Sequence, residues 1–454
     1  LVAYERASVA EGAVLDRARV VTMMRSLLGR SFDADYGGFG PEPKFPHLDA
    51  LTFLLHQYYY TGDEQCREMV TKTLDVIADS SFYDLEEGGV FRCSATRDWN
   101  LPSSEKILED NVGFLKIYLE TYQLTGVERY RERAEGILGY IVATLVDQEV
   151  GGFYGSQAGD EHYYVMPLVE RRKRHKPAVD TAVLTGSNGK AISAFCYAAE
   201  VLGRADLLEL AQRAAERILA KGRSEGMGMF RHARGPDRMA GLLVDQVFMV
   251  EALIALGDAA GVPEHLAAAE RLAAYMVSHL RDEADGGFRD APSDNDALGN
   301  LKVPRKPYEL NVEAARIFHE LHLRTGSCHY DEVGQKLLLA LRQRFLDMEL
   351  RGAGFAEVVD YVARPTMVAT IVGNPRDSTV AALRRAASVP YYPKKVVRVV
   401  DPDRNPEEVS RVGISPGGLP ALVLSRCGGH AVTLRDAAKV VPAVKALAAE
   451  LRAL

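Results

Sequence analysis

A pair of glycines, adjacent or one residue apart and followed by an apolar residue, recurs along this chain and limits its fold more than any other feature. The first copy is Gly37-Gly38-Phe39, and the others begin at Gly88, Gly151, Gly226, Gly286 and Gly352, at intervals of 51 to 75 residues. Six copies at this spacing indicate an internal repeat. Paired glycines permit positive φ where the chain leaves a helix, and the apolar side chain can then pack into the core.

A second kind of break alternates with the first. It is a short turn between two helical patterns, with glycine just after the first helix, at Gly62, Gly126, Gly203, Gly261 and Gly326. Short turns on one side and long Gly-Gly loops on the other predict a series of helical hairpins. An open helical solenoid has the same local pattern, but six repeats favour a closed ring whose inner helices run one way and outer helices the other.

After the sixth copy the pattern changes. Short β-like runs at Thr366–Val372, Lys395–Val400 and Leu419–Leu424 alternate with helical patterns at Ser378–Ala387 and Leu434–Leu451. We therefore predict an all-α toroid, an (α/α)6 six-hairpin barrel over residues 1–360, with a small α/β extension at residues 361–454 packed on it. The sixth inner helix is not evident: either it is short and lies near Thr366, or other elements close the ring.

Charge and hydropathy exclude several classes of partner. A formal net charge of −7 and a pI near 6.0 give no general attraction to nucleic acid or to an anionic membrane. The basic run at residues 170–176 indicates a local cationic loop. No apolar run approaches the roughly 20 residues that span a bilayer. No signal peptide is visible, so a cytoplasmic location is expected.

The cysteines and histidines do not form a recognisable metal or redox motif. Five cysteines are scattered singly, with neither a Cys-x-x-Cys pair nor a Cys/His cluster at metal-ligand spacing. His319 and His322 share one helical pattern, but the sequence places no matching acidic ligand near them. We expect no metal and no cofactor, and thiol redox chemistry lacks the cysteine pair that it needs.

Polar residues at the N-terminal ends of the inner helices are candidates for a site, because these ends converge on the centre of a ring. The densest set follows Trp99 and comprises Glu105, Lys106, Glu109, Asp110 and Asn111. In a helix, Glu105 and Glu109 lie on one face and Lys106 and Asp110 on the next. Two opposed carboxylates can act as general acid and base on a sugar, with aromatic rings as stacking platforms. The alternative is that these charges only favour the helix dipole.

Weaker signals of the same kind occur at other loops. They are the pairs Asp245 with Gln246, Glu309 with Asn311, and Asp35 with Lys44. Each pair can line the cleft or can fix its own loop through hydrogen bonds. The sequence contains no phosphate-binding loop, no Gly-x-Ser-x-Gly and no Rossmann fingerprint.

Two longer motifs resemble the signatures of a known family. GGFGPEPKFP, residues 37–46, is similar to a GGFG-x-x-PKFP signature, and residues 88–111 resemble a second one that runs from Gly-Gly through a Trp to Asp-Asn. Both are typical of the thioredoxin-domain-containing proteins related to spermatogenesis-associated protein 20. Shorter matches follow in order at residues 151–157, 187–194 and 372–377. The resemblance implies a six-hairpin toroid after an N-terminal thioredoxin-like domain, of which this chain holds no counterpart.

The resemblance also implies a set of site residues. The matching positions are Lys44, Arg92, Asp98, Trp99, Glu105, Lys106, Asp110, Asn111 and Asn188. The chain departs from the family pattern at Ser103-Ser104, where the family has His-Phe, at Glu109, where it has Tyr, and at Ser187, where it has Trp. The family's toroid is similar to those of N-acylglucosamine 2-epimerases and six-hairpin glycosidases, which implies a carbohydrate connection by fold analogy.

The sequence leaves two hypotheses open. In the first, the protein is carbohydrate-active or carbohydrate-binding, with an epimerase-like or glycosidase-like cleft. Glu105 and Asp110 are then the acid and base, Trp99 is a stacking wall, and Asp245 joins the substrate-binding residues. In the second, the toroid has lost catalysis and acts as a protein-binding or scaffold subunit. The expected partners are accordingly a small carbohydrate or another protein, and neither nucleic acid nor a membrane.

Overall fold

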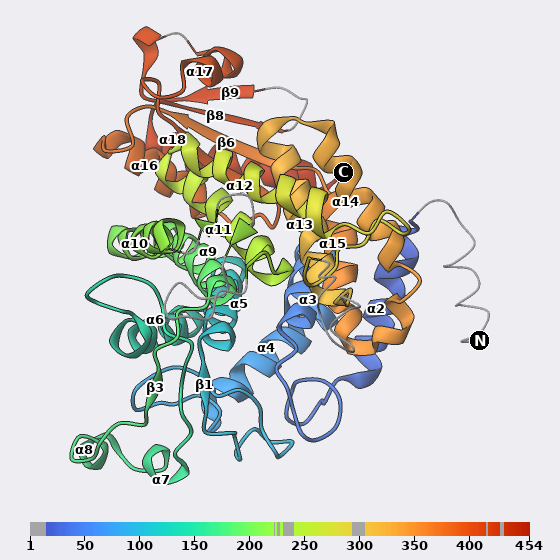
Figure 1. Ribbon diagram of the computed structural model, residues 1–454, viewed down its shortest axis with the longest axis vertical. Helices are drawn as coiled ribbons and strands as arrows, with labels where there is room; N and C mark the ends of the chain where they lie inside the picture. Colours follow the sequence, from blue (N-terminus) through green and yellow to red (C-terminus); the bar gives the residue numbers. More distant parts are fainter. Residues whose placement is uncertain are drawn as a thin grey trace.

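Helical hairpins form a closed ring in the computed structural model (Figure 1), which describes residues 15–221, 223–224, 228–229, 240–292, 305–414, 416–426 and 431–454. The inner helices are α3 (Leu48–Thr61), α5 (Leu108–Thr125), α9 (Thr185–Leu202), α11 (Leu243–Ala260), α13 (Tyr308–Thr325) and α15 (Ala353–Ala363). The outer helices are α2 (Arg17–Ser31), α4 (Glu64–Asp79), α6 (Glu128–Tyr140), α10 (Ala205–Lys221), α12 (Pro263–Tyr275) and α14 (Cys328–Leu341). A π-helical turn extends α6 to Leu145 and another extends α12 to Leu280.

Contacts between neighbouring helices close the ring. Each inner helix packs against the next, and α15 packs against α3. Five outer helices pair with the inner helix before them, whereas α2 pairs with α15, so the first and last helices of the ring make the sixth hairpin. The inner helices are apolar on most sides, as expected for helices enclosed by neighbours. The predicted six-hairpin toroid is confirmed.

The short turns end the inner helices as predicted. Gly62, Gly126, Gly203, Gly261 and Gly326 are left-handed, and each donates its backbone N–H to a carbonyl of the last helical turn. Glycine adopts this conformation without the steric cost that a side chain would impose.

The long loops share a motif with an aspartate four residues before the first glycine. In the loops that begin at Asp33, Asp84, Asp147 and Asp282, the aspartate carbonyl accepts from the first glycine, and the aspartate N–H donates to the second. A buried or partly buried cation then bonds the carboxylate. The pairs are Lys44–Asp33 at 2.6 Å, Lys106–Asp84 at 2.7 Å, Arg217–Asp147 at 2.9 Å and Lys306–Asp282 at 2.7 Å. In the first three pairs the cation also donates to the carbonyl of the first glycine.

In three of the loops, an asparagine in the first turn of the following inner helix clamps the residue after the glycine pair. Asn188 accepts from the Phe153 N–H at 2.8 Å and donates to the Phe153 carbonyl and to Leu184, both at 2.9 Å. Asn111 and Asn311 make the same three bonds in their own loops. These asparagines therefore tie each loop to the start of the helix that follows it.

The sixth Gly-x-Gly copy does not form such a loop. Phe345–Gly352 is a 3₁₀ segment, and α15 begins at Ala353, so the glycines lie at a helix start. The copy lacks the aspartate four residues earlier, where Met348 stands. Because α15 ends at Ala363, the sixth inner helix is the short one near Thr366. Part of the copy at Gly226, including Met227 and Phe230, lies outside the described residues.

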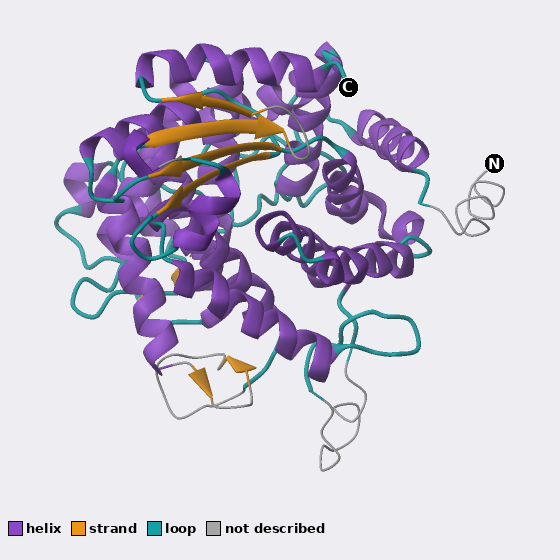
Figure 2. Cartoon of the chain, turned by 90° about the horizontal axis from the view of Figure 1, so that it is seen from above, coloured by secondary structure: helices purple, strands orange, loops and turns teal. Residues whose placement is uncertain are grey.

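A mixed sheet follows the ring, as predicted. Its strands are β6 (Met367–Val372), β7 (Lys395–Val400), β8 (Ala421–Arg426) and β9 (Ala431–Leu434), in the order β7-β6-β8-β9, with β6 and β7 parallel and the other pairs antiparallel. Its helices are α16 (Ser378–Ser388), α17 (Pro406–Val412) and α18 (Ala437–Arg452). Figure 2, a view onto this end of the molecule, shows the four strands side by side.

The sheet packs on the end of the ring where the short turns lie. Strand β7 contacts α11, and α16 contacts α9. Figure 1 shows the long loops that carry β1 (Lys106–Ile107), β3 (Val179–Asp180), α7 (Glu161–Tyr164) and α8 (Leu168–Arg171) at the opposite end. The division of the chain at residue 360 stays a prediction. Within the described residues, no helix is long and apolar enough to cross a bilayer.

The asparagine clamp can be tested by Asn188→Ala. The change leaves the buried N–H and carbonyl of Phe153 without a partner, while the Leu184 carbonyl keeps the backbone N–H of residue 188, so we expect the free energy of unfolding to fall by about 2–4 kcal/mol. Asn100→Ala, at an exposed asparagine that bonds Ser81, is the control and should cost less than about 1 kcal/mol. Urea denaturation measures both. Equal losses in the two variants would contradict the clamp.

Candidate active site

The inner helices enclose a cavity of about 610 Å³. It begins at their first turns, where Asp49 and Asp110 lie, and continues to their last turns, where Glu200 and Arg324 lie. Pro393, Lys395 and Val397, in and just before β7, also line it. The C-terminal sheet therefore forms part of the wall at the short-turn end, and a volume of this size is typical of a small-molecule site.

Charged side chains line the cavity from every inner helix. The carboxylates are Asp49, Glu109, Asp110, Glu120, Glu200, Glu251, Asp258, Glu309, Glu313, Glu320 and Glu357. The basic side chains are His56, Lys116, Lys190, Arg316, Arg324, Arg351 and Lys395. Acidic groups thus outnumber basic ones among the described lining residues.

Most of the cations are paired with a carboxylate. Lys190 lies 2.6 Å from Glu109, and Arg324 lies 2.6 Å from Asp258. Arg316 pairs with Glu357 and lies 3.2 Å from Glu313. These pairs hold the walls of the cavity in place.

A histidine joins two of the inner helices through carboxylates. His56 Nδ1 lies 3.1 Å from Glu357, and its Nε2 lies 3.8 Å from Glu120. Burial alone would lower the pKa of His56, but the hydrogen bonds to the two glutamates raise it to about 9. The ring is therefore an imidazolium at neutral pH and not a free base.

Two carboxyl groups near the long-loop end have no such partner. Neither Asp49 nor Asp110 makes a hydrogen bond or an ion pair with the described part of the chain, and Asp110 Oδ2 is buried. Burial raises the pKa of each to about 6; the charge of Glu313 adds to the effect at Asp49 and that of Glu109 at Asp110. Unpaired carboxyls with raised pKa values in a cavity are typical of general acids and bases.

Of the ten residues predicted for the site, Asp110 lines the cavity, and the structure places the other nine outside it. Glu105 lies 3.9 Å from Arg92, and both side chains are exposed. Asp98 accepts hydrogen bonds from Thr96 and Asn100 within its own loop. Asp245 accepts from the Gly186 N–H at 3.0 Å. These placements fit the alternative in which such residues fix their loops.

Trp99 cannot serve as a stacking wall in this conformation. Its side chain is fully buried, its Nε1 donates to the Tyr36 carbonyl at 3.0 Å, and its ring packs edge-on against Phe82. Lys44, Asn111 and Asn188 are likewise buried within the loop motifs described above.

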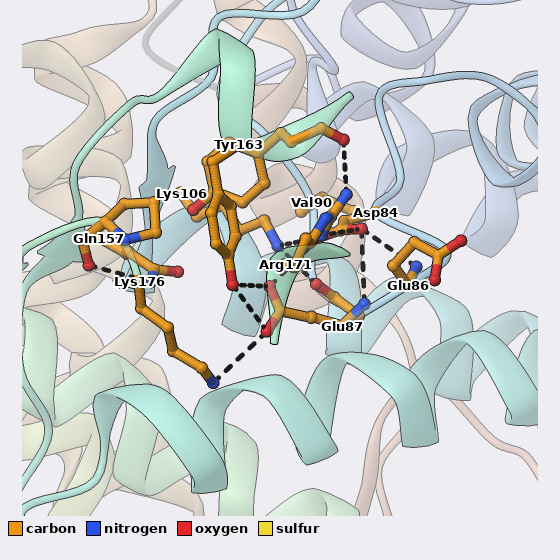
Figure 3. Close-up of polar contacts among 12 residues, drawn as sticks. Asp84, Glu86, Glu87, Val90, Lys106, Gln157, Tyr163, Arg171 and Lys176 are labelled. Carbon is orange, nitrogen blue, oxygen red and sulfur yellow. Dashed lines mark hydrogen bonds and ion pairs between the residues drawn. The ribbon is translucent and has the colours of Figure 1, made fainter. Parts of the chain in front are cut away.

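Lys106 lies in a buried charge network between two long loops (Figure 3). Its ammonium bonds Asp84 and lies over the rings of Tyr140 and Tyr164, at 4.4 and 4.9 Å from their centroids. Arg171 reaches the same aspartate at 2.8 Å from the next loop. Glu87 extends this network toward solvent by pairing with Lys176 at 3.4 Å.

The cavity residues that sequence reasoning missed share a helical spacing. On α3 they are Asp49 and His56, and on α5 they are Lys116 and Glu120, which follow the predicted candidate Glu109 at intervals of seven and four residues. Polar side chains at this spacing lie on one face of a helix. A polar stripe along an otherwise apolar inner helix was the signal that could have found them. Within the described residues, no group of three or more His, Cys, Asp or Glu side chains could hold a metal ion.

Six hairpins closed around an acid-lined cavity define the structural class, a six-hairpin toroid. Solved structures with this fold include the cellobiose 2-epimerase of Bacillus thermoamylovorans, with a TM-score of 0.57 and 11% identity over 71% of this chain and 85% of that one. A D-mannose isomerase is also similar, with a TM-score of 0.55 and 12% identity over 71% of this chain and 83% of that one. So is a family 76 α-mannanase of Bacteroides thetaiotaomicron, with a TM-score of 0.55 and 11% identity over 76% of this chain and 94% of that one. At these identities the likeness shows the fold alone.

The predicted resemblance to proteins related to spermatogenesis-associated protein 20 is confirmed over part of the chain. A segment of 138 residues, 29% of this chain, is 34% identical to that protein from Mus musculus and from Homo sapiens. The match spans 17% of the length of these relatives. No protein-family model matches the sequence.

The structural role of Lys106 predicts the effect of Lys106→Met. Removing the ammonium leaves Asp84 buried with only Arg171 as its cation, so we expect the free energy of unfolding to fall by about 3 kcal/mol. Lys176→Met is the matched control at the exposed edge of the same network and should cost less than about 1 kcal/mol. Thermal and urea unfolding report the difference. A Lys106→Met protein as stable as the control would rule out this role.

Proposed function

We propose that this protein is a carbohydrate-active enzyme whose substrate binds in the cavity of the ring, with Asp49 and Asp110 as its acid and base groups. The observation that carries the proposal is the pair of unpartnered carboxyls at the first turns of α3 and α5, which are neighbours in the ring. The similar folds of a sugar epimerase, a sugar isomerase and a mannanase support the choice of substrate class.

The chemistry follows from the pKa values of these two groups. At a pKa near 6, each carboxyl is present in both its protonated and its ionised form close to neutral pH. A protonated carboxyl donates to a glycosidic, ring or carbonyl oxygen, and an ionised one accepts a proton from water or from a sugar carbon. In hydrolysis the ionised carboxyl accepts a proton from water, and in epimerisation it accepts a proton from a sugar carbon. In this proposal Asp49 replaces Glu105, whose side chain lies outside the cavity.

Asp49→Asn and Asp110→Asn test the assignment. Each variant should lower kcat/KM by about 10²- to 10⁴-fold, because an amide neither donates nor accepts the proton that the reaction needs. The assay is a panel of neutral mono- and disaccharides, read by reducing-sugar release for hydrolysis and by NMR for epimers. Asp206→Asn, in the first turn of outer helix α10 and paired there with Arg204, is the matched control. Full activity in Asp110→Asn would exclude this mechanism.

The same aspartates predict a link between stability and pH. A carboxyl whose pKa rises from 3.8 to about 6 on folding binds more protons in the folded state, so the free energy of unfolding falls as the pH rises from about 4 to 6. Asp49→Asn removes this effect. The variant should therefore be more stable than the parent at pH 7, by about 1 kcal/mol after allowance for the open cavity, and equal to it near pH 4. Urea denaturation at both pH values decides the matter, and a variant less stable at pH 7 would contradict the raised pKa.

A further inference from the structure

Lys116 is the side chain in the cavity whose surroundings most clearly indicate a ligand-binding role. It lies on α5, six residues after Asp110 and therefore about 9 Å deeper along the helix axis. Although it lies within the ring, its side chain keeps accessible surface, which faces the cavity. No hydrogen bond or ion pair joins it to the described residues, whereas Lys190, Arg316 and Arg324 are all paired there.

The neighbours of Lys116 determine what it can do. Burial alone would lower its pKa, but the charges of Glu120 and Glu251 raise the pKa above its ordinary value. It is therefore an ammonium at neutral pH. This state excludes a role as nucleophile or base and makes Lys116 a hydrogen-bond donor toward the cavity.

The charges at this depth of the cavity disfavour an anionic ligand. Four positive groups, His56, Lys116, Lys190 and Arg316, face five carboxylates, namely Glu109, Glu120, Glu251, Glu313 and Glu357. Burial raises the pKa of Glu251, whereas the charge of Lys116 and the hydrogen bond from Ser193, at 3.0 Å, favour its ionised form. A bound carboxylate or phosphate would add to an excess of negative charge in a confined site, where like charges repel strongly.

We infer that the cavity selects an uncharged sugar, with Lys116 donating to one of its oxygens and with Glu251 and its neighbours excluding uronic acids and sugar phosphates. The inference rests on the proposed function and adds the substrate class to it. A neutral sugar adds no negative charge to this acidic site and supplies the acceptor that Lys116 lacks.

The test compares matched probes on the full chain by thermal shift and calorimetry. A panel of neutral sugars, including D-glucose, D-mannose and cellobiose, is screened first, and each hit is compared with its uronic acid and its 6-phosphate. We expect the neutral sugar to bind at least tenfold more tightly than each anionic analogue. Tighter binding of a uronate or a phosphate would overturn the inference and leave the proposed function standing. No binding of any sugar by the folded protein would overturn both.

Two substitutions connect this preference to named residues. Glu251→Gln removes one negative charge and should raise the affinity for the uronic acid by about tenfold or more while changing that for the neutral sugar less. Glu216→Gln makes the same change of net charge on the exposed face of α10 and should alter neither affinity. Lys116→Met should weaken the binding of the neutral sugar by about tenfold, and the variant should still exclude the uronate. Identical affinities in Glu251→Gln and Glu216→Gln would contradict a cavity that selects by charge.

Discussion

The cross-link between an aspartate, a cation and a glycine carbonyl is the interaction on which the rest of this structure depends. Each such loop bends the chain from an outer helix to the next inner one, and the second glycine and the residue after it are buried, so their polar groups need partners inside the protein. At Asp33, burial opposes ionisation, but the hydrogen bonds from Arg97 and Lys44 lower its pKa. The asparagine clamp then fixes the next inner helix to the same loop, and this fixes where Asp110 and Lys190 stand around the cavity.

The ring is closed by parts of the chain that are far apart in sequence. Helix α2 packs on α15, and Arg17 of α2 pairs with Asp360 of α15 at 2.7 Å. The C-terminal sheet then covers the short-turn end, where Lys395 donates to three carbonyls of residues 387–390 and lines the cavity. The unpaired carboxyls, Asp49 and Asp110, lie at the opposite end of the ring, which the long loops form.

The helices could be predicted from the sequence because each carries its own periodicity, and because five of the inner helices end at a glycine, the residue that a left-handed turn requires. The site could not, and residues 105–111 show why. The pattern predicts a helix from Lys106, but α5 begins at Leu108, and Lys106 lies in β1, which pairs with Ser156–Gln157. This shift of two residues moves Glu105 and Lys106 off the helix face that they would share with Glu109 and Asp110.

Residue type was a second source of error, because groups that bind ligands also hold buried loops together. Lys44 and Trp99 lie in loops that contain a glycine pair, and Asn188 lies at the helix start after such a loop, which is the pattern of a binding loop, yet the side chain of each makes its contacts within the protein. Asp49 shows the opposite case. Along α3 the sequence marks it only by its seven-residue spacing from His56, and the ring brings it beside the carboxylates of α13 and α15.

The departures from the family pattern bear on whether the cavity still serves catalysis. Glu109 and Ser187, which stand where the family has Tyr and Trp, contact each other: the Ser187 hydroxyl donates to Glu109 at 2.8 Å, and Lys190 completes the group at 2.6 Å. Burial opposes ionisation of Glu109, but Lys190 and Ser187 lower its pKa, so the carboxylate is stabilised where it lines the cavity. Two partners thus hold the Glu109 carboxylate, whereas the adjacent Asp110 carboxyl has none among the described residues, and this difference favours Asp110 over Glu109 for the proposed proton transfer.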